Sequence, residues 1–239
     1  MAGYTLITGA SGAIGRAAAL KLAAKKKPLF LHYHQSKNEA FALKEKCEAY
    51  GVPVYLVKSD LSKKGGAEEL FKQLHSPVHT LIYNCGISHY GFFQDIQEKE
   101  LYELGNLHLL NAMLLTKKLL PSMISNKQGN IVMISSIWGN RGAAMEVAYS
   151  AFKGGVNSFV KSLSKETARS GIRVNALAPG VIETPMMAGF SDEERAALKE
   201  EIPSGRFGTA EEAAEAISFL TSEKAGYING HVLDINGGW

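Results

Sequence analysis

Seven short apolar runs, most of them separated by helix-length amphipathic stretches, constrain the fold of this chain more than any other feature. The runs are predicted to be strands over residues 4–8, 28–33, 52–57, 79–84, 129–135, 172–179 and 230–235. Their nearly continuous apolar character is typical of parallel strands that are buried on both faces. Segments 17–27, 38–51 and 151–171 lie between strands and are predicted to be helices. We therefore predict an α/β fold with a doubly wound parallel sheet of about seven strands and helices on both faces.

Length and composition favour one globular domain over residues 1–239. The chain is 46% hydrophobic, and it contains neither a repeat nor a linker rich in Pro or Ser. A net charge of +3 without a long Lys/Arg block argues against a nucleic-acid partner, and the sequence has no apolar run of the roughly 18 residues that a membrane span needs. The two cysteines form no disulfide framework, and the N-terminus begins on a short strand instead of a leader. We expect a cytoplasmic protein.

A glycine-rich turn, TGASGAIG, follows the first predicted strand and opens a helix. Glycines at such a turn let backbone N–H groups approach a pyrophosphate at the positive end of the helix. Ordinary turns also contain Gly and Ser, but the position after an N-terminal strand favours a dinucleotide site. Ligands of such sheets bind beyond the carboxyl ends of the strands, so the residues after each strand are the candidates for the site.

The end of the second strand bears on the choice of cofactor. Ser36 and Lys37 stand where an acid would hydrogen-bond the adenosine ribose of NAD(H), and no acid occurs before Glu39. This favours NADP(H), while NAD(H) remains an alternative. In a second interpretation the loop is merely polar, and His32 and His34, alternate residues on one strand face, are simply exposed. Neither histidine has a third ligand at a suitable spacing, so no metal site is predicted.

The segment VAYSAFKGG places Tyr149 and Lys153 four residues apart in a predicted helix, where side chains are neighbours. The pair by itself could be a surface contact. The set of motifs along the whole chain, however, resembles the classical short-chain dehydrogenase/reductase family, in its 3-oxoacyl-[acyl-carrier-protein] reductase branch. The resemblance rests on TGASGAIG, SDLS, YNCG, ISSIWG, YSAFK, APGVIETPM, RFGTAEEAA and YINGHVLDINGG, which occur in the order of the family.

The resemblance implies a single-domain Rossmann fold and a catalytic Ser136, Tyr149 and Lys153. Tyr149 would be the general acid/base, Lys153 would lower its pKa and bind the nicotinamide ribose, and Ser136 would hold the substrate carbonyl. The family spacing of thirteen residues before the Tyr selects Ser136 over Ser135. The implied cofactor residues are Gly9, Ser11, Gly12, Ala13, Ile14, Gly15, Ser36, Lys37, Asp60, Leu61, Asn84, Cys85, Gly86, Tyr149, Lys153, Pro179, Gly180, Ile182 and Thr184.

The sequence departs from the family at the fourth catalytic position, which is usually Asn. Two family spacings, counted from Gly86 and from Ser136, both place it at residue 108, which is His. The family residue holds a water largely through its main-chain carbonyl, so a side-chain change need not abolish activity. His108 is interpreted either as a proton relay near neutral pH or as a residue that fills the slot beside a helix bend. Further departures are Ala13 and Gly12 in the turn, and Tyr83 and Cys85 after the fourth strand.

The leading functional hypothesis is an NADP(H)-dependent reductase that converts a 3-oxoacyl thioester, delivered by an acyl carrier protein, to the alcohol. The alternatives are reduction of a 5-aminopentanone group on modified elongation factor P, another specialised ketone, or a dinucleotide-binding regulator without turnover. Residues 182–203 are expected to form a lid. Met186, Met187 and Phe190 would line one side of the substrate site and Trp138, Tyr90 and Phe92 the other. The resemblance also implies a homotetramer or homodimer built on helices within residues 98–125 and 149–170.

Overall fold

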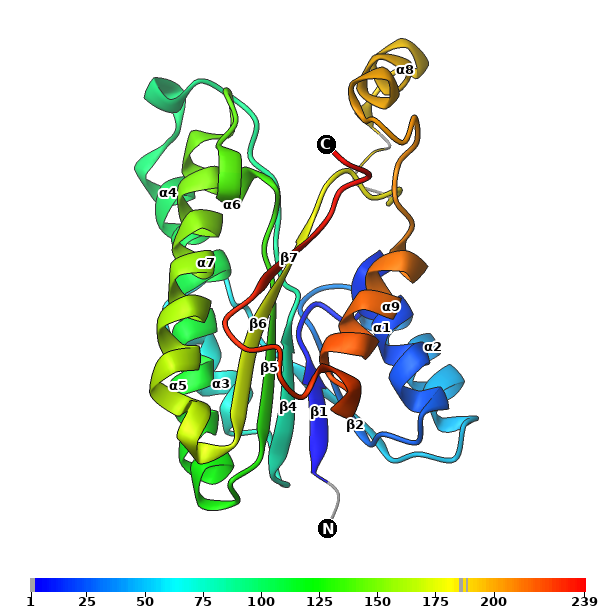
Figure 1. The fold of residues 1–239 in the computed structure, drawn as a ribbon, viewed down its shortest axis with the longest axis vertical. Helices are drawn as coiled ribbons and strands as arrows, with labels where there is room; N and C mark the ends of the chain where they lie inside the picture. Colours follow the sequence, from blue (N-terminus) through cyan, green and yellow to red (C-terminus); the bar gives the residue numbers. More distant parts are fainter. Residues whose placement is uncertain (1–2, 185–186, 188) are drawn as a thin grey trace.

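The computed structural model describes residues 3–184, 187 and 189–239, and its centre is a seven-stranded parallel sheet (Figure 1). The strand order is β3-β2-β1-β4-β5-β6-β7, and every neighbouring pair is parallel. The strands are β1 (Tyr4–Ile7), β2 (Leu29–Tyr33), β3 (Val54–Lys58), β4 (Val78–Tyr83), β5 (Gly129–Ile134), β6 (Ile172–Pro179) and β7 (Val232–Ile235). All seven predicted strands are therefore confirmed, with ends that differ by at most two residues.

Helices cover both faces of this sheet, as the alternation of segments predicted. One face carries α1 (Ala13–Ala24), α2 (Lys37–Glu48) and α9 (Ala210–Leu220). The other carries α3 (Gly66–Phe71), α4 (Glu98–Gly105), α5 (Asn111–Ser125) and α7 (Val147–Thr167). Two hydrophobic clusters, one per face, form the core because strand side chains alternate between the faces. The predicted doubly wound fold is confirmed.

A single turn of π-helix, η2 (Asn106–Leu110), joins α4 to α5 and contains His108. Tyr83, at the end of β4, donates a hydrogen bond from its hydroxyl to the carbonyl oxygen of Leu107 over 2.8 Å. π-turns of this kind interrupt the regular i→i−4 ladder and are frequent at functional sites. The predicted helix bend at residue 108 is therefore present as a π-turn.

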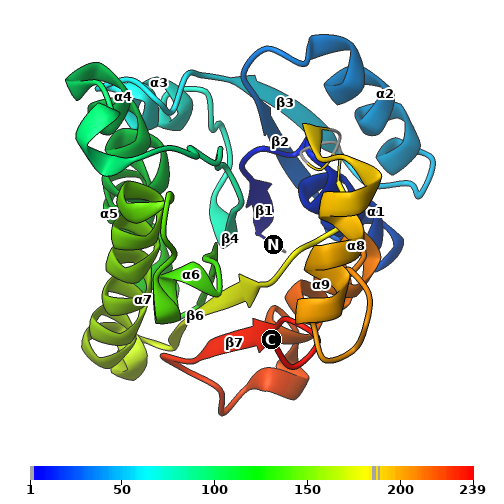
Figure 2. The same cartoon turned by 90° about the horizontal axis from the view of Figure 1, so that it is seen from above.

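The carboxyl edge of the sheet carries the irregular elements. Viewed from above, α6 (Trp138–Arg141) lies on the side of α5 and α7, and α8 (Asp192–Glu201) lies on the side of α1 and α9 (Figures 1 and 2). Short 3-10 turns complete the chain at Phe93–Asp95, Ala168–Ser170 and Glu223–Ala225. In the described part of the chain, no helix is both long and apolar enough to cross a membrane. The same residues contain no group of three side chains placed to hold a metal ion.

Candidate active site

The glycine-rich turn after β1 is shaped by close backbone contacts. Gly9 has a φ of +61°, a conformation that L side chains rarely adopt. A side chain at Gly15 would place its Cβ 2.4 Å from the carbonyl oxygen of Gly9, so only glycine lets α1 begin this close to the turn. Gly12 caps α1 without any side-chain hydrogen bond to the first helical turn. Free N–H groups and the positive helix end therefore face outward, as a bound pyrophosphate requires.

His32 lies beneath this turn and is not exposed. Only 2% of its surface is accessible, so the interpretation of His32 and His34 as two exposed residues is wrong for His32. Its Nδ1 accepts a hydrogen bond from the Gly9 N–H at 3.1 Å, and its Nε2 lies 3.1 Å from the carbonyl oxygen of Ser59. Burial lowers the pKa of His32 to about 4, so the ring stays neutral and serves as a structural support for the turn.

Asn84 and Cys85, which follow β4, form hydrogen bonds with Thr8 and Gly9 of the glycine-rich turn. The Asn84 backbone N–H donates to the Thr8 hydroxyl at 2.9 Å, and its side-chain amide donates to the Gly9 carbonyl at 3.1 Å. Cys85 also reaches Thr8 through its backbone N–H. Burial raises the pKa of the Cys85 thiol to about 12, which leaves it protonated and unreactive, as expected of a filler.

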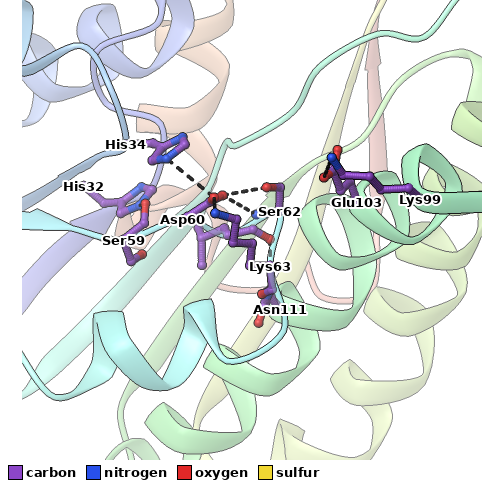
Figure 3. A network of polar contacts seen from close by, with 10 residues as sticks. His32, His34, Ser59, Asp60, Ser62, Lys63, Lys99, Glu103 and Asn111 are labelled. Atoms are coloured by element: carbon purple, nitrogen blue, oxygen red, sulfur yellow. Dashed lines mark hydrogen bonds and ion pairs between the residues drawn. The ribbon is translucent and has the colours of Figure 1, made fainter.

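Asp60 lies at the end of β3, where the resemblance predicted a contact with adenine (Figure 3). Its carboxylate accepts hydrogen bonds from the Ser62 backbone and hydroxyl, at 3.0 and 2.6 Å, and lies 3.3 Å from the Lys63 ammonium and 3.6 Å from the His34 ring. The Ser62 and Lys63 contacts outweigh partial burial and lower the pKa of Asp60. The carboxylate is thus held rigidly beside the buried Leu61.

Ser36 and Lys37 lie in the exposed segment that opens α2, next to His34. Ser36 is the N-cap of α2, and its side chain makes no capping hydrogen bond. Its hydroxyl is therefore available to a ligand at the carboxyl end of β2.

Ser136, Tyr149 and Lys153 converge at the carboxyl end of β5. Ser136 is buried after the strand, and its hydroxyl oxygen accepts a hydrogen bond from the Trp138 N–H at 3.2 Å. Accepting this bond leaves the hydroxyl proton of Ser136 for a donated hydrogen bond of its own. Lys153 is 4% exposed, donates to the Ile134 carbonyl at 2.8 Å, and lies 5.5 Å from the centre of the Tyr149 ring. Neighbouring Ser135 is buried and contacts the Lys153 backbone carbonyl instead.

Burial shifts the pKa of both titratable groups. It raises the pKa of Tyr149 to about 12, a hydrogen bond with Ser136 opposes the rise, and the charge of Glu146 adds to it. Burial lowers the pKa of Lys153 to about 8. The phenol is therefore protonated at neutral pH and the lysine is still mainly charged, which is the pairing that an acid catalyst requires.

His108 completes this cluster. Its ring meets that of Tyr149 edge to face, with centres 5.2 Å apart. Its Nε2 lies 2.9 Å from the Ile87 carbonyl oxygen, while Nδ1 is buried and finds no hydrogen-bond partner among the described residues. Burial, and then the charge of Lys153, lower the pKa of His108 to about 3.

The segment after β6 approaches the site from the opposite side. Pro179 accepts a hydrogen bond from the Ile137 N–H. A Cβ added to Gly180 would lie 3.0 Å from the Cα of Asn236, so the backbones of these two residues lie close together. Ile182 is buried and bridges to Gly208, and Thr184 accepts a backbone hydrogen bond from Met187. The predicted residues 179, 180, 182 and 184 thus follow one another along the carboxyl edge.

The predicted apolar walls are only partly formed as expected. Met187 packs with Ile202 and Phe207 in a small core beneath α8, whereas Phe190 is exposed and Met186 lies outside the described residues. On the other side, Trp138 meets Trp239 edge to face, with ring centres 5.2 Å apart. Tyr90 and Phe92 are largely exposed, on the loop that follows β4.

The sequence does not indicate the roles of two residues of this site, of which Tyr83 is noted there only as a departure from the family. Tyr83 holds the π-turn, and Glu146 lies at the start of α7 close enough to Tyr149 to influence its pKa. Glu146 stands three residues before Tyr149, so helical spacing could have indicated it. The hydrogen bond from Tyr83 to Leu107 joins residues 24 positions apart, and no local sequence pattern predicts such a contact.

Comparisons with known proteins place this arrangement in a family. Residues 9–239 match the family described as "Enoyl-(Acyl carrier protein) reductase". The chain is 46% identical over 235 residues to the "Uncharacterized oxidoreductase YmfI" of Bacillus subtilis, covering 98% of this chain and 97% of that protein. It is 37% identical to the "3-oxoacyl-[acyl-carrier-protein] reductase FabG" of Aquifex aeolicus, covering 98% and 96%.

Solved structures agree with the sequence relatives. A 3-oxoacyl-[acyl-carrier protein] reductase from Brucella melitensis superimposes with a TM-score of 0.91 at 27% identity, over 99% of this chain and 90% of the other. An Agrobacterium tumefaciens 3-oxoacyl (acyl-carrier-protein) reductase with NADP bound gives 0.91 at 26% identity, over 99% and 94%. The chain therefore belongs to the short-chain dehydrogenase/reductase family, among relatives similar to FabG. It is an oxidoreductase that acts on CH–OH/C=O groups.

The family uses a nicotinamide dinucleotide, and the residues present fit one. Gly12 begins α1 without a side chain that could cover the helix N-terminus, and Gly86 lies beside Lys153 and His108 without a Cβ. The Lys153 ammonium keeps protons beyond the one donated to Ile134. When bound there, the cofactor supplies or accepts the hydride.

Proposed function

We propose that this protein is an NADP(H)-dependent reductase that converts a ketone to a secondary alcohol, with 3-oxoacyl thioesters as the first candidate substrates. The observation that carries this proposal is the convergence of Ser136, Tyr149 and Lys153 at the carboxyl end of β5. Sequence relatives and a solved structure named as 3-oxoacyl-[acyl-carrier-protein] reductases support the choice of substrate.

The three side chains have distinct tasks in the proposed reaction. The Ser136 hydroxyl, already fixed by Trp138, donates a hydrogen bond to the substrate carbonyl oxygen. Tyr149 gives its proton to that oxygen as negative charge develops on it. The Lys153 ammonium, held by Ile134, stabilises the phenolate that remains until Tyr149 is protonated again.

The preference for NADP(H) is proposed from the end of β2. Ser36, Lys37 and His34 form an exposed polar and basic segment that contains no carboxylate of its own, and the Asp60 carboxylate beside it is paired with Lys63 and lies 3.6 Å from the His34 ring. Replacing both Ser36 and Lys37, as S36A/K37A, is expected to raise the KM for NADPH more than that for NADH. Equal effects on the two cofactors would contradict this assignment.

A second candidate substrate is a ketone that carries an ammonium group, of which a 5-aminopentanone group on modified elongation factor P is one example. The favouring observation is Glu146, a half-buried carboxylate one helical turn before Tyr149. It accepts a hydrogen bond from the Ser88 hydroxyl at 2.6 Å, but it forms no ion pair with any Lys, Arg or His of the described residues. A cation on the substrate would offset this charge beside the reacting oxygen.

Turnover assays distinguish the candidates. NADPH and NADH consumption is followed with an acetoacetyl thioester, with an amino ketone, and with the same ketone after N-acetylation, which removes its charge. If the wild-type protein reduces the thioester and the Tyr149→Phe variant lowers kcat by about 100-fold or more, the protein is a thioester reductase. Preference for the charged ketone that disappears in Glu146→Gln assigns the second substrate class. Dinucleotide binding without turnover of any carbonyl would overturn both and favour a regulatory protein.

We further propose a homotetramer or homodimer, formed through the outer surfaces of α4, α5 and α7. Leu110, Met113 and Leu114 lie on one face of the π-turn and α5, each at least 40% exposed, and Val147 of α7 is 45% exposed. Contiguous exposed apolar side chains of this kind are typical of subunit contacts.

A further inference from the structure

The side chain of Asn111, in the first turn of α5, is buried against the loop that joins β3 to α3 (Figure 3). Its amide nitrogen donates to the carbonyl oxygens of Leu61 and Lys63, at 2.8 Å each. Its amide oxygen accepts a hydrogen bond from the Ala67 N–H at 3.1 Å. The three partners are backbone groups that lie between 44 and 50 positions away in sequence. One side chain therefore binds both ends of the segment 61–67.

This loop has no regular structure of its own between the end of β3 at Lys58 and the start of α3 at Gly66. Backbone groups in such a segment need hydrogen-bond partners from elsewhere. Gly65, the N-cap of α3, has no side chain that could cap the helix, and Asn111 supplies that bond at the Ala67 N–H. Because burying an amide is costly without hydrogen bonds, an apolar side chain would fill the same space at lower cost. The hydrogen bonds to the loop are therefore the reason for an asparagine here.

The same loop contains Asp60 and Leu61, for which the resemblance predicts a contact with adenine. The Leu61 side chain is 2% exposed, and its carbonyl oxygen is one of the two that Asn111 holds. The Asp60 carboxylate is bound by Ser62, a residue of the loop itself, so its position follows that of the loop backbone. An ionised carboxylate is an acceptor and suits the 6-amino group of adenine. The position of this acceptor thus depends on Asn111.

We propose that Asn111 is a positioning residue for the adenine end of the dinucleotide, and that it acts through the backbone of the loop that contains Asp60 and Leu61. The inference rests on the proposed function only in that the dinucleotide binds with its adenine at this loop. The side-chain hydrogen bonds of Asn111 go to the loop and not to the catalytic cluster. Its effect therefore falls on cofactor affinity and not on proton transfer.

The backbone of Asn111 joins this loop to the π-turn η2. Its N–H donates to the Asn106 carbonyl oxygen and so closes the turn. The same turn contains His108, whose ring contacts that of Tyr149. The loop at the adenine end and the element beside the catalytic tyrosine are thus held by one residue, which fixes their relative position.

Binding of paired cofactors tests this proposal without turnover. The probes are NADPH and its hypoxanthine analogue, in which an oxygen replaces the 6-amino group of adenine, and the corresponding pair of NADH. The wild-type protein should bind the adenine form about 10-fold or more tightly, because the analogue loses a hydrogen bond to a charged carboxylate. In Asn111→Ala this preference should fall to about 3-fold or less, since Asp60 is no longer held in place. Titration calorimetry measures both dissociation constants.

The ratio of the two constants separates an effect on adenine from a general loss of stability. Thr116→Ala, which removes a fully buried side chain of the same helix, should destabilise the protein and keep the wild-type preference. An undiminished preference in Asn111→Ala would overturn the proposal. So would a wild-type protein that binds the adenine and hypoxanthine forms equally, whether or not it reduces any ketone.

Steady-state kinetics give a second readout. Asn111→Ala should raise the KM for NADPH by about 10-fold and leave kcat at saturating NADPH within about 2-fold of the wild type. Asn111→Asp keeps the acceptor that caps α3 but loses both donated hydrogen bonds, so it should raise this KM as well. A wild-type KM for Asn111→Asp would show that the residue only caps α3. A lower kcat with an unchanged KM in Asn111→Ala would show that it acts on the catalytic cluster instead.

Discussion

At the scale of single residues, the site depends on the buried ammonium of Lys153, a charged group that is costly to remove from water. Lys153 is 4% exposed and is held by the Ile134 carbonyl beneath Tyr149. Desolvation disfavours its ammonium form and lowers its pKa to about 8, below the ordinary 10.5. The protein therefore loses stability in order to hold a proton donor next to the phenol, as strained functional sites commonly do.

This loss of stability can be measured. A lysine whose pKa is lower in the folded state binds fewer protons there, so its penalty is complete below about pH 8 and is relieved as the pH rises toward 10.5. At pH 7, Lys153→Met should therefore raise the free energy of unfolding by about 1 to 3 kcal/mol while abolishing turnover. Urea unfolding at pH 7 and pH 10 measures the effect, which should shrink at the higher pH. Lys161→Met, on the exposed side of α7, should change little, and a destabilised Lys153→Met would contradict the argument.

At the scale of secondary structure, the π-turn η2 is an irregular element near the site, and the Tyr83 side chain binds it to the end of β4. Regular helix across residues 98–125 would satisfy more backbone groups locally, so the turn needs tertiary support. Tyr83 supplies it through the hydrogen bond to Leu107.

Removing the Tyr83 hydroxyl should therefore weaken this turn. Tyr83→Phe leaves the buried Leu107 carbonyl without that donor and is expected to cost about 1 to 3 kcal/mol of stability. Chemical unfolding measures the loss, and kcat should fall with it because His108 is no longer fixed. Tyr102→Phe is the control, since Tyr102 of α4 is 63% exposed. An unchanged unfolding free energy for Tyr83→Phe would show that η2 is stable by itself.

The helices α8 and α9 both begin with a capping box, but they differ in how much of each helix is buried. Ser191 and Thr209 each accept a hydrogen bond from the N–H three residues on, but α8 has no buried residue and α9 has six. Loss of a cap costs about 1 kcal/mol. Ser191→Ala should thus increase amide hydrogen exchange within 192–201 without a change in Tm, whereas Thr209→Ala should lower Tm. A fall in Tm for Ser191→Ala would mean that α8 is part of the cooperative core, contrary to the predicted lid.

At the scale of the whole molecule, the sheet gathers side chains from the ends of several strands onto one edge. β1, β4, β5 and β6 are adjacent in the order of the sheet, although residues 7 and 179 are far apart in sequence. On the outer surface of the molecule, α4, α5 and α7 form a layer in which several apolar side chains remain exposed in a single chain.

The proposed subunit contact predicts a change of mass in solution. Leu114→Glu would bury a charge in that contact and should yield smaller particles by size-exclusion chromatography with light scattering. Tyr50→Glu, on the other face of the sheet at the end of α2, should retain the mass of the wild type. A monomeric wild-type protein would contradict the proposal directly.

The sequence determined the elements whose signals are local. The strands follow from continuous apolar runs, the cofactor turn from glycines at fixed spacing, and the Tyr149–Lys153 neighbourhood from helical geometry, because backbone sterics and burial act over a few residues. The burial of His32, the contact of His108 with Ile87, the contact of Tyr83 with Leu107 and the hydrogen bond between Ser88 and Glu146 follow from the tertiary structure alone. Those properties depend on what packs against a side chain from distant segments. Desolvation and hydrogen bonding act through space, so no pattern along the chain encodes them.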